Sequence, residues 1–594
     1  MNREAVLHIN TEDFVYPISR QQLIFRIRTA RKDVKQCTLV YWNRTEPELK
    51  KETEMACCLR DGLFDYWKIS VTFHQIARYQ KYYFKILDTE NNLWYFSANG
   101  INQEIPENGF FEYLYANGTD VIKVPDWAKG AIYYQIFPER FCNGSVDNDP
   151  EECAEWGTFP TRENYMGGDL EGIIHKLAYL EKLGIDCIYL NPIFKGDFNH
   201  KYATTDYYEI DPMFGTKEIF SDLVTKCHER NIKVILDGVF NHTGVHFEQF
   251  QDVVKNQEKS KYADWFYFKK FPFKISHHDY ECVGAYKWMP KLNSSNPEVR
   301  EFILDVMTYW IENYQIDGWR LDVADEVDPA VWQEARIRLK SKYPDIILIG
   351  ETWGYGGKML RGNQMDSVMN YMFRDALWDY FGKEVITAKE FDHRINHMLA
   401  LYKDCTNQVM FNLIDSHDTE RFLFVCKENK ELQKLAVAFQ MLFPGSPAVF
   451  YGDEVGMTGD NDPDCRRCMV WDENADKVIF EWYARLIGIH KSFSCVRSGE
   501  YRTILADNET DSFAFTRFNE ENSVYVVIHK GKDEVQLEIP VLDAEDNYID
   551  LLGKKEIKSE SMKEKYFYNG DTTEYKAKIK LKMSPYSVKV ISKK

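Results

Sequence analysis

Short apolar runs alternate with helical periodicity through the middle of the chain, and this pattern predicts repeated βα units. The first apolar run, Ile132–Phe137, is followed by Ile173, Ile174, Leu177, Leu180 and Leu183 at helical spacing. Gly184 then stands where a helix C-cap is expected. Seven further apolar runs, typical of buried parallel strands, are Cys187–Leu190, Val234–Leu236 and the segments around Trp319, Leu348, Val368, Phe411 and Val449. Eight such strands with intervening helices predict a closed (β/α)8 TIM barrel.

The two ends of the chain show a period of two instead, which is typical of β-sandwiches. Phe25, Ile27 and Thr29 alternate with arginines near the N-terminus, and Lys578–Lys582 alternates near the C-terminus. The segment from about 243 to 296 is too long for an ordinary βα loop and predicts an inserted lobe after strand three. We therefore expect a multidomain α/β chain with an N-terminal β-sandwich, a barrel and a C-terminal β-sandwich, at residues 1–122, 123–500 and 501–594.

Bulk properties narrow the class of protein. A chain of 594 residues is too long for one hydrophobic core, and its net charge of −19 argues against a nucleic-acid or anionic-membrane partner. The N-terminus has no apolar signal-peptide region, and thirteen cysteines without framework spacing predict reduced thiols in the cytoplasm. Cys465 and Cys468 have redox-motif spacing, but no second pair accompanies them, so we expect neither a metal nor a redox role.

Polar residues gather where four of the predicted barrel strands end, which is the place where barrel enzymes hold their chemistry. The four motifs are Asp237–His242, Gly318–Asp322, Gly350–Trp353 and Asp415–Asp418. Asp322, Glu351 and Asp418 are carboxylates without metal-binding histidine or cysteine pairs beside them, as glycoside hydrolysis requires. Any one acid alone is more simply a solvated loop residue or half of a salt bridge. Their ordered recurrence at strand ends favours a glycosidase.

At these motifs the chain resembles the α-amylase superfamily of glycoside hydrolases, from Tyr133 to about Trp471. Within it the chain resembles the neopullulanase, cyclomaltodextrinase and maltogenic amylase subgroup, which also carries an N-terminal β module of starch-binding type. The motifs that carry the resemblance are Met289–Asn293, Asn199–Tyr202, Thr205–Tyr207 and Tyr451–Gly456.

The resemblance implies three catalytic roles. Asp322 is the expected nucleophile, Glu351 the acid/base, and Asp418 the carboxylate that stabilises the positive transition state. A retaining pair lies about 5–5.5 Å apart, and adjacent strands are about 4.8 Å apart, so neighbouring strand ends suit the pair. Arg320 shares a strand face with Asp322 and is expected to keep that carboxyl ionised.

The resemblance also implies a substrate-binding set and a calcium site. The sugar-binding residues are Tyr202, His242, Arg320, Trp353, His417, Asp462 and Arg466, whereas Asp237 and Asn241 look structural. The calcium ligands are Asn143, Ser145, Asn148, Asp149, the Gly167 carbonyl and Asp169; oxygen ligands of this mix suit calcium. Ser145 stands where an acidic ligand is usual, and an Asn/Asp-rich loop with its own turns is the alternative.

Two positions depart from the subgroup pattern. Asp325 stands where Asn is frequent, at a position linked to the choice between α-1,4 and α-1,6 bonds, and Ala203 replaces an Asp. The sequence thus predicts a retaining α-glucan hydrolase that cuts α-1,4 bonds in cyclodextrins, maltooligosaccharides and pullulan, with some transglycosylation. An oligo-α-1,6-glucosidase and a non-catalytic glucan-binding subunit are the alternatives.

The subgroup resemblance also implies a homodimer in which the N-terminal module of one copy walls the site of the other. That module is rich in aromatic residues, among them Trp42, Trp67, Tyr82 and Trp94. Such residues bury inside a sandwich, bind glucan or cover a partner.

Overall fold

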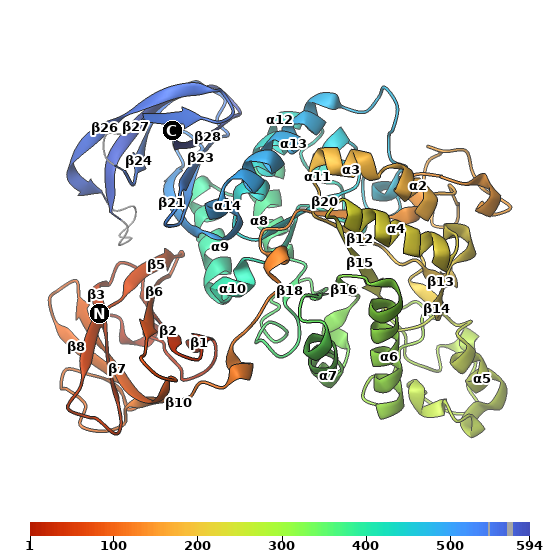
Figure 1. Ribbon diagram of the computed structural model, residues 1–594, viewed down its shortest axis with the longest axis horizontal. Helices are drawn as coiled ribbons and strands as arrows, with labels where there is room; N and C mark the ends of the chain where they lie inside the picture. Colours follow the sequence, from red (N-terminus) through yellow and green to blue (C-terminus); the bar gives the residue numbers. More distant parts are fainter. Residues whose placement is uncertain (544–546, 567–573) are drawn as a thin grey trace. The chain divides into compact units, whose positions relative to one another are not determined.

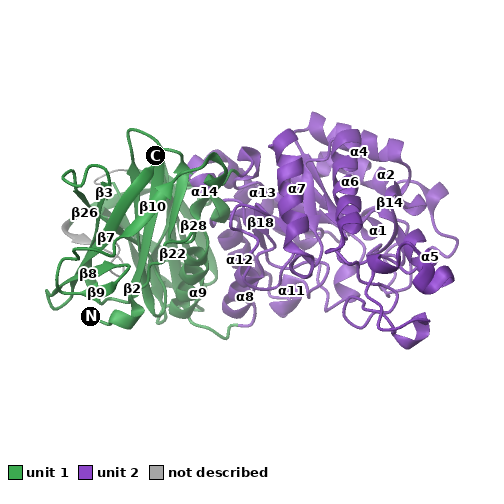
Figure 2. Cartoon of the chain, turned by 90° about the horizontal axis from the view of Figure 1, so that it is seen from below, with its two compact units in different colours: residues 1–123, 384–407, 499–594 green, residues 124–383, 408–498 purple. Residues whose placement is uncertain are grey.

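In the computed structural model, which describes residues 1–543, 547–566 and 574–594, the chain forms two compact units (Figure 2). One unit comprises residues 124–383 and 408–498, and the other comprises residues 1–123, 384–407 and 499–594. Residues 384–407 lie within the segment predicted as barrel, yet they group with the two β modules.

The unit of residues 124–383 and 408–498, unit 2 in Figure 2, contains a parallel sheet of eight strands, which confirms the predicted barrel (Figure 1). The strands follow the order β18-β17-β16-β15-β12-β11-β20-β19, and a single parallel bridge between Met369 and Phe411 links the two ends. Side chains such as Tyr133, Ile235 and Ile349 fill the buried core. The strands are β11 (Tyr133–Ile136), β12 (Cys187–Leu190), β15 (Lys233–Gly238), β16 (Gly318–Leu321), β17 (Ile347–Gly350), β18 (Ser367–Val368), β19 (Phe411–Leu413) and β20 (Ser446–Phe450).

Helices separate consecutive barrel strands along the chain, except for β17 and β18, between which the described residues 351–366 contain no helix (Figure 1). The helix predicted from Ile173 to Leu183 is in fact two, α2 (Leu170–His175) and α3 (Leu177–Leu183), which meet at Lys176. Gly184 ends α3 with a left-handed φ of 94°, as its place in the sequence predicts. The others include α4 (Lys217–Glu229), α6 (Pro297–Tyr314), α7 (Pro329–Lys342), α8 (Tyr371–Leu377), α12 (Lys430–Leu442) and α13 (Lys477–Ser492).

The segment after β15 forms the predicted inserted lobe, with one helix, α5 (Glu248–Asn256), and little regular structure otherwise. Phe250 packs edge-on against Phe266 and Tyr280, and these rings give the lobe a small core. An isolated bridge pairs His242 with Lys291, so the end of the lobe returns to the mouth of the barrel. The lobe is preceded in the chain by the hairpin of β13 (Phe194–Asp197) and β14 (Ala203–Ile210).

Within the other unit, unit 1 in Figure 2, the N-terminal module is a β-sandwich, and its aromatic residues are mostly internal. Trp42, Trp67 and Tyr82 are 4%, 3% and 0% exposed, which selects burial over an exposed glucan platform for these three. One sheet has the order β1-β2-β6-β5, and the other has β4-β3-β7-β8-β9 with β10 on β7. The strands are β1 (Val15–Ser19), β2 (Gln22–Ala30), β3 (Val34–Asn43), β4 (Lys51–Glu54), β5 (Ala56–Arg60), β6 (Phe64–Thr72), β7 (Arg78–Asp88), β8 (Leu93–Ser97), β9 (Gly100–Asn102) and β10 (Phe111–Tyr115).

The C-terminal module is an antiparallel sheet of eight strands whose end strands, β21 and β24, touch each other. The sheet therefore folds back on itself. The strands are β21 (Glu500–Asp507), β22 (Ser512–Phe518), β23 (Ser523–His529), β24 (Val535–Val541), β25 (Asn547–Asp550), β26 (Lys555–Tyr566), β27 (Tyr575–Met583) and β28 (Ser587–Lys593). Helix α9 (Ala388–Leu401) contacts β5 and β21, which explains why residues 384–407 join this unit. None of the helices in the described ranges has the length and apolar character to cross a bilayer.

Candidate active site

The carboxyl ends of three adjacent strands bring together two of the predicted acids, Asp322 and Glu351, and Asp237. Leu321 of β16 pairs with Gly350 of β17, so the residues that follow them, Asp322 and Glu351, leave neighbouring strands at one level. Asp237 of β15 pairs with Arg320 of β16 on the other side. The parallel register therefore assembles a site from residues that are distant in the sequence.

Arg320 is the centre of this arrangement. Its fully buried guanidinium places Nη1 2.8 Å from both Asp237 Oδ1 and Asp322 Oδ1. Nη2 lies 2.9 Å from Glu351 Oε2. One guanidinium thus holds three carboxyl groups, which fixes the two expected catalytic acids side by side.

Burial dominates the titration of these acids. It raises the pKa of Glu351 above its ordinary value; Arg320 opposes this effect, and the charge of Asp418 adds to it. Burial also raises the pKa of Asp322, and Arg320 lowers it again. The expectation that Arg320 keeps Asp322 ionised is therefore met only in part: Arg320 lowers the pKa of Asp322, but burial and the charges of Glu351 and Asp237 outweigh this effect. Of the two acids, Asp322 accepts a hydrogen bond from Arg320, and this bond favours its ionised form.

The loop after β16 supplies a backbone donor to this pair. The Val323 amide donates to Glu351 Oε2 at 2.9 Å, and the Glu351 amide donates back to the Leu321 carbonyl. Val323 has a φ of 44°, a left-handed conformation that costs free energy in a β-branched residue. This strain lies directly beside the catalytic pair, where the fold holds it in place.

Tyr202 and His417 form a second group, bound to Asp237. The Tyr202 hydroxyl donates to Asp237 Oδ2 at 2.8 Å and lies 2.7 Å from His417 Nε2. The two rings are parallel within 2° at a centroid distance of 5.4 Å. Asp237 also accepts a hydrogen bond from Tyr189 at 2.6 Å. Asp237 is thus part of the site itself, whereas the sequence indicated only a role in shaping the strand.

A third group surrounds Asp418. Arg466 Nη2 lies 3.2 Å from Asp418 Oδ1, and Nη1 lies 2.9 Å from Asp462 Oδ1. The Asp418 side chain remains 30% exposed, far more than Asp322 at 8%. The structure therefore joins the predicted pair Asp462 and Arg466 to the third acid.

Trp353 and His242 occupy contrasting positions. Trp353 is 52% exposed and stacks on Tyr371 at a centroid distance of 4.3 Å, so it presents surface for a sugar ring. His242 is 2% exposed, and its Nε2 lies 3.1 Å from the Tyr202 carbonyl oxygen. Burial lowers the pKa of His242 to about 3, so the ring is neutral. Its visible contact supports Tyr202, and its expected role in sugar binding stays a prediction.

Several residues of the site escaped the sequence analysis. Gln135 Nε2 lies 2.7 Å from His417 Nδ1, and Asn191 Nδ2 donates to the Tyr202 hydroxyl at 2.9 Å. Gln135 is a polar residue within an apolar strand run, and Asn191 directly follows such a run. A polar residue within or directly after a buried strand could have marked both as site residues in the sequence. Tyr189 and Tyr371 carried none, because aromatic residues are ordinary core material.

The two departures from the family pattern have clear surroundings. Thr352 Oγ1 donates to Asp325 Oδ2 at 2.9 Å, so Asp325 is tied to the residue after Glu351. Ala203 is fully buried, and its position offers no polar group to a substrate.

The six residues expected to bind calcium lie in two neighbouring subsets. Asn143 Nδ2 donates to Asp149 Oδ1 at 2.8 Å, and both side chains press against Gly167, where an added Cβ would be 2.3 Å from that oxygen. Asp169 accepts backbone hydrogen bonds at the start of α2, among them one from Ser145 at 3.0 Å. The buried Asn148 Oδ1 has no hydrogen-bond partner. An orphaned oxygen beside this oxygen-rich cluster fits a hard cation such as Ca²⁺.

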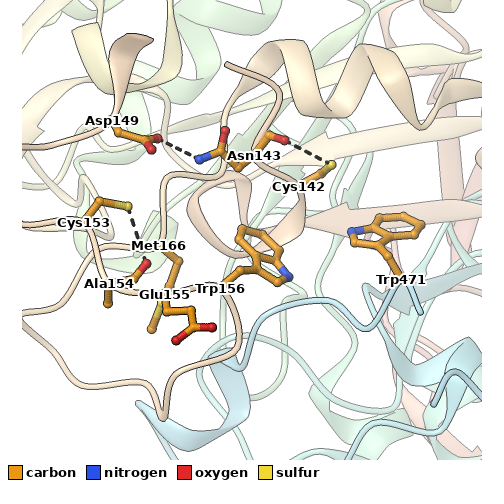
Figure 3. A pocket seen from close by; sticks show the side chains of 9 residues that line it. All are labelled: Cys142, Asn143, Asp149, Cys153, Ala154, Glu155, Trp156, Met166 and Trp471. Atoms are coloured by element: carbon orange, nitrogen blue, oxygen red, sulfur yellow. Dashed lines mark hydrogen bonds between the residues drawn. The ribbon is translucent and has the colours of Figure 1, made fainter. Parts of the chain in front are cut away.

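A pocket of about 500 Å³ adjoins this cluster (Figure 3). Asn143 and Asp149 line it together with the indole rings of Trp156 and Trp471 and the thiols of Cys142 and Cys153. The thirteen cysteines all lie in the described ranges and form no disulfide there, and Cys465 and Cys468 are buried. Burial raises the pKa of Cys465 to about 12, which makes it a poor nucleophile or metal ligand.

Comparisons to known proteins agree with the fold. Residues 135–497 match the model of the alpha amylase catalytic domain, and residues 1–117 match the alpha amylase N-terminal ig-like domain. The chain belongs to the alpha-amylase family of glycoside hydrolases.

The particular relatives lie in one subgroup. The chain is 43% identical to a cyclomaltodextrinase of Thermoanaerobacter pseudethanolicus, over 94% of this chain and 97% of that protein. It is 41% identical to neopullulanase 2 of Thermoactinomyces vulgaris, over 90% and 93%. A solved cyclomaltodextrinase structure matches with a TM-score of 0.93 and 36% identity over the whole of both chains. The resemblance at the barrel motifs is thereby confirmed along the chain.

Proposed function

We propose that this chain is a retaining α-glucan hydrolase that cleaves α-1,4-glucosidic bonds in cyclodextrins, maltooligosaccharides and pullulan, with some transglycosylation. The observation that carries the proposal is the pair Asp322 and Glu351, held on one buried guanidinium at the ends of neighbouring strands. The relatives named cyclomaltodextrinase and neopullulanase support this substrate class.

The geometry suits a double displacement. Glu351, in its acid form, donates its proton to the glycosidic oxygen while ionised Asp322 attacks the anomeric carbon. The leaving sugar departs and a glycosyl ester of Asp322 forms. Glu351, now a carboxylate, takes a proton from water as the water oxygen attacks the same carbon, and Asp322 is released. A sugar hydroxyl in place of water gives transglycosylation.

The remaining residues act through position and charge. Asp418, with Arg466 beside it, is the most exposed of the three acids and is placed to accept hydrogen bonds from sugar hydroxyls. Tyr202, whose hydroxyl is fixed by Asp237, offers its ring to the sugar at the point of cleavage. Trp353 offers its exposed ring to the leaving-group side.

Product analysis tests the proposal. Thin-layer chromatography of digests of β-cyclodextrin, pullulan and soluble starch should show short maltooligosaccharides from the cyclic substrate. Proton NMR of early products should show the α-anomer first, because two displacements retain configuration. An initial β-anomer, or no hydrolysis of any of the three substrates by the folded protein, would contradict the proposal.

A second candidate activity is α-1,6 cleavage of short oligosaccharides. The observation that favours it is the hydrogen bond from Thr352 to Asp325, which places a carboxylate beside the acid/base strand where Asn is frequent in the subgroup. Relative rates on panose and maltotriose separate the two activities. The non-catalytic alternative is disfavoured, because Asp322 and Glu351 meet on Arg320 and the charge of Asp418 acts on Glu351.

We also propose a structural calcium ion at the loop that contains Asn143, Asn148 and Asp149. The oxygen atom of Asn148 without a partner supports it. When bound, calcium would tie this loop to Gly167 and to the start of α2 and would take no part in the chemistry.

For the assembly we propose a homodimer, and for the location the cytoplasm, where free cysteines stay reduced. The internal Trp42, Trp67 and Tyr82 give no support to a dimer. Exposed Leu114 and Tyr115 of β10, 58% and 41% exposed, are better placed to meet a second copy.

A further inference from the structure

The ammonium group of Lys291 occupies a position that the catalytic steps do not use. Lys291 lies at the end of the inserted lobe, and its side chain is only 19% exposed. Its Nζ donates to Asn241 Oδ1, and it lies 3.2 Å from the Glu326 carbonyl oxygen and 3.4 Å from Glu326 Oε2. One cation therefore meets oxygen atoms from two loops, the loop after β15 and the turn after β16.

The first of these loops leads to the tyrosine of the site. Asn241 is buried, and the Leu292 amide donates to its carbonyl oxygen at 3.0 Å. The end of the lobe therefore bonds to both the side chain and the backbone of Asn241. The next residue, His242, lies 3.1 Å from the Tyr202 carbonyl oxygen. Lys291 is thus connected to Tyr202 through Asn241 and His242.

The second loop carries the catalytic pair. Glu326 ends the short 3-10 turn Ala324–Glu326, and the turn begins after Val323, whose φ of 44° is strained. The Val323 amide is the backbone donor to Glu351 Oε2. A strained conformation persists only when its surroundings hold it, and the contact of Lys291 with the far end of the turn supplies such a hold.

We propose that Lys291 is a positioning residue, whose ammonium ties the turn after Asp322 to the loop after β15 and so keeps the Val323 amide on Glu351. The inference rests on the proposed function, in which Glu351 is the acid/base. The Glu326 carboxylate is 54% exposed, so its ion pair with Lys291 contributes little. The charge-assisted bonds to the buried Asn241 amide oxygen and to the Glu326 carbonyl carry the effect.

A specific pH signature follows. The groups that face Glu351 are Arg320, Asp322, Asp418 and the Val323 amide, together with the neutral hydroxyls of Tyr371 and Tyr189. The Val323 hydrogen bond stabilises the ionised form of Glu351 and therefore lowers its pKa. Release of the turn removes this effect, so the pKa of Glu351 rises and the alkaline limb of kcat/KM moves up by about one pH unit.

The test uses the full chain with Lys291→Met, which keeps the length of the side chain and removes the charge. Lys259→Met, at an exposed lysine of the same lobe, is the matched control. For maltotriose we expect kcat to fall roughly 100-fold with little change in KM, because small displacements of acting groups cost about this much. For α-maltosyl fluoride, whose leaving group needs little protonation, we expect a loss at least tenfold smaller. Lys291→Arg, which restores the charge, should recover part of the rate.

Equal losses on the two substrates, an unshifted alkaline limb or an unchanged kcat in folded Lys291→Met would overturn the proposal. If Lys291→Met does not fold by circular dichroism, Lys291→Gln replaces it, because its amide still donates to Asn241. A smaller upward shift of the alkaline limb of kcat/KM is then expected. An alkaline limb at the wild-type pH would count against the proposal. Failure of the proposed function itself would show separately, as an inactive wild-type chain.

Discussion

At the residue scale, Arg320 holds the carboxyl groups of Asp237, Asp322 and Glu351 in one site. A fully buried guanidinium with three carboxyl groups leaves an excess of negative charge, and burial raises the pKa values of Asp237, Asp322 and Glu351. Such a cluster is costly to assemble, and raised carboxyl pKa values of this kind favour general acid catalysis.

The change Asp322→Asn should abolish hydrolysis while the fold stays intact. We expect a loss of at least about 10⁴-fold in kcat, because the nucleophile is removed and no other group replaces it. The free energy of unfolding should be unchanged or higher, because one of the crowded buried carboxyls is gone. Rates on maltotriose, together with thermal melts followed by circular dichroism, check both statements. Substantial residual activity in the folded variant would remove Asp322 as the nucleophile.

At the element scale, the pairing of β16 with β17 sets the geometry of the catalytic acids. Gly318 opens β16, and a Cβ built there would lie 2.2 Å from the Ile347 carbonyl oxygen of β17. Only glycine permits the two backbones to approach this closely. The glycine therefore serves the strand pair that carries Asp322 and Glu351.

Gly318→Ala should destabilise the barrel by about 2–3 kcal/mol and lower activity, since the clash involves backbone and cannot be relieved by a rotamer change. Gly488→Ala is the matched control. It lies on an exposed face of α13 with open space around it and should stabilise the protein by about 0.5–1 kcal/mol. Denaturant unfolding of both variants measures the difference. Equal stability of the two would show that the strand pair adjusts to the larger residue.

The loop that contains Asn143 and Asp149 is the second element with a testable property. If calcium binds there, chelation with EDTA should lower the melting temperature by a few degrees, and added calcium should restore it. Asp149→Asn should remove this calcium dependence without changing kcat, because the loop is apart from the catalytic acids. A wild-type melting temperature that changes with neither EDTA nor added calcium would contradict the calcium proposal.

At the scale of the whole molecule, the chain carries two β modules besides its barrel, and residues 384–407 bind to both. Helix α9 contacts β5 of the N-terminal module and β21 of the C-terminal module. Deletion of residues 1–122 would therefore remove contacts that helix α9 makes within its own unit, among them the pair His397 and Asp61, and a destabilised protein is the expected result. Point changes on the module surface are a cleaner probe of assembly than truncation.

Sedimentation of the intact chain should show a homodimer. Rate measurements should show that this dimer hydrolyses β-cyclodextrin faster than starch. Leu114→Glu, on exposed β10, should weaken the dimer and raise the relative rate on starch, because a charge replaces an apolar contact at the proposed interface. Leu63→Glu, at another exposed leucine of the module, is the control. A monomeric wild type that prefers starch would refute the dimer. It would also refute the idea that the N-terminal module of one copy walls the site of the other.

The sequence by itself determined the barrel and the flanking β modules, and it singled out Asp322, Glu351 and Asp418 as the candidate acids. Apolar periodicity records burial directly, and the polar residues after Leu321 and Gly350 mark strand ends. Tertiary structure alone decided that Asp237 shares Arg320 with the acids, that Lys291 reaches Glu326, and that Trp42 and Trp67 face inward. These facts depend on distances between segments far apart in the chain. A local pattern of polar and apolar residues carries no information about which distant side chain completes a contact.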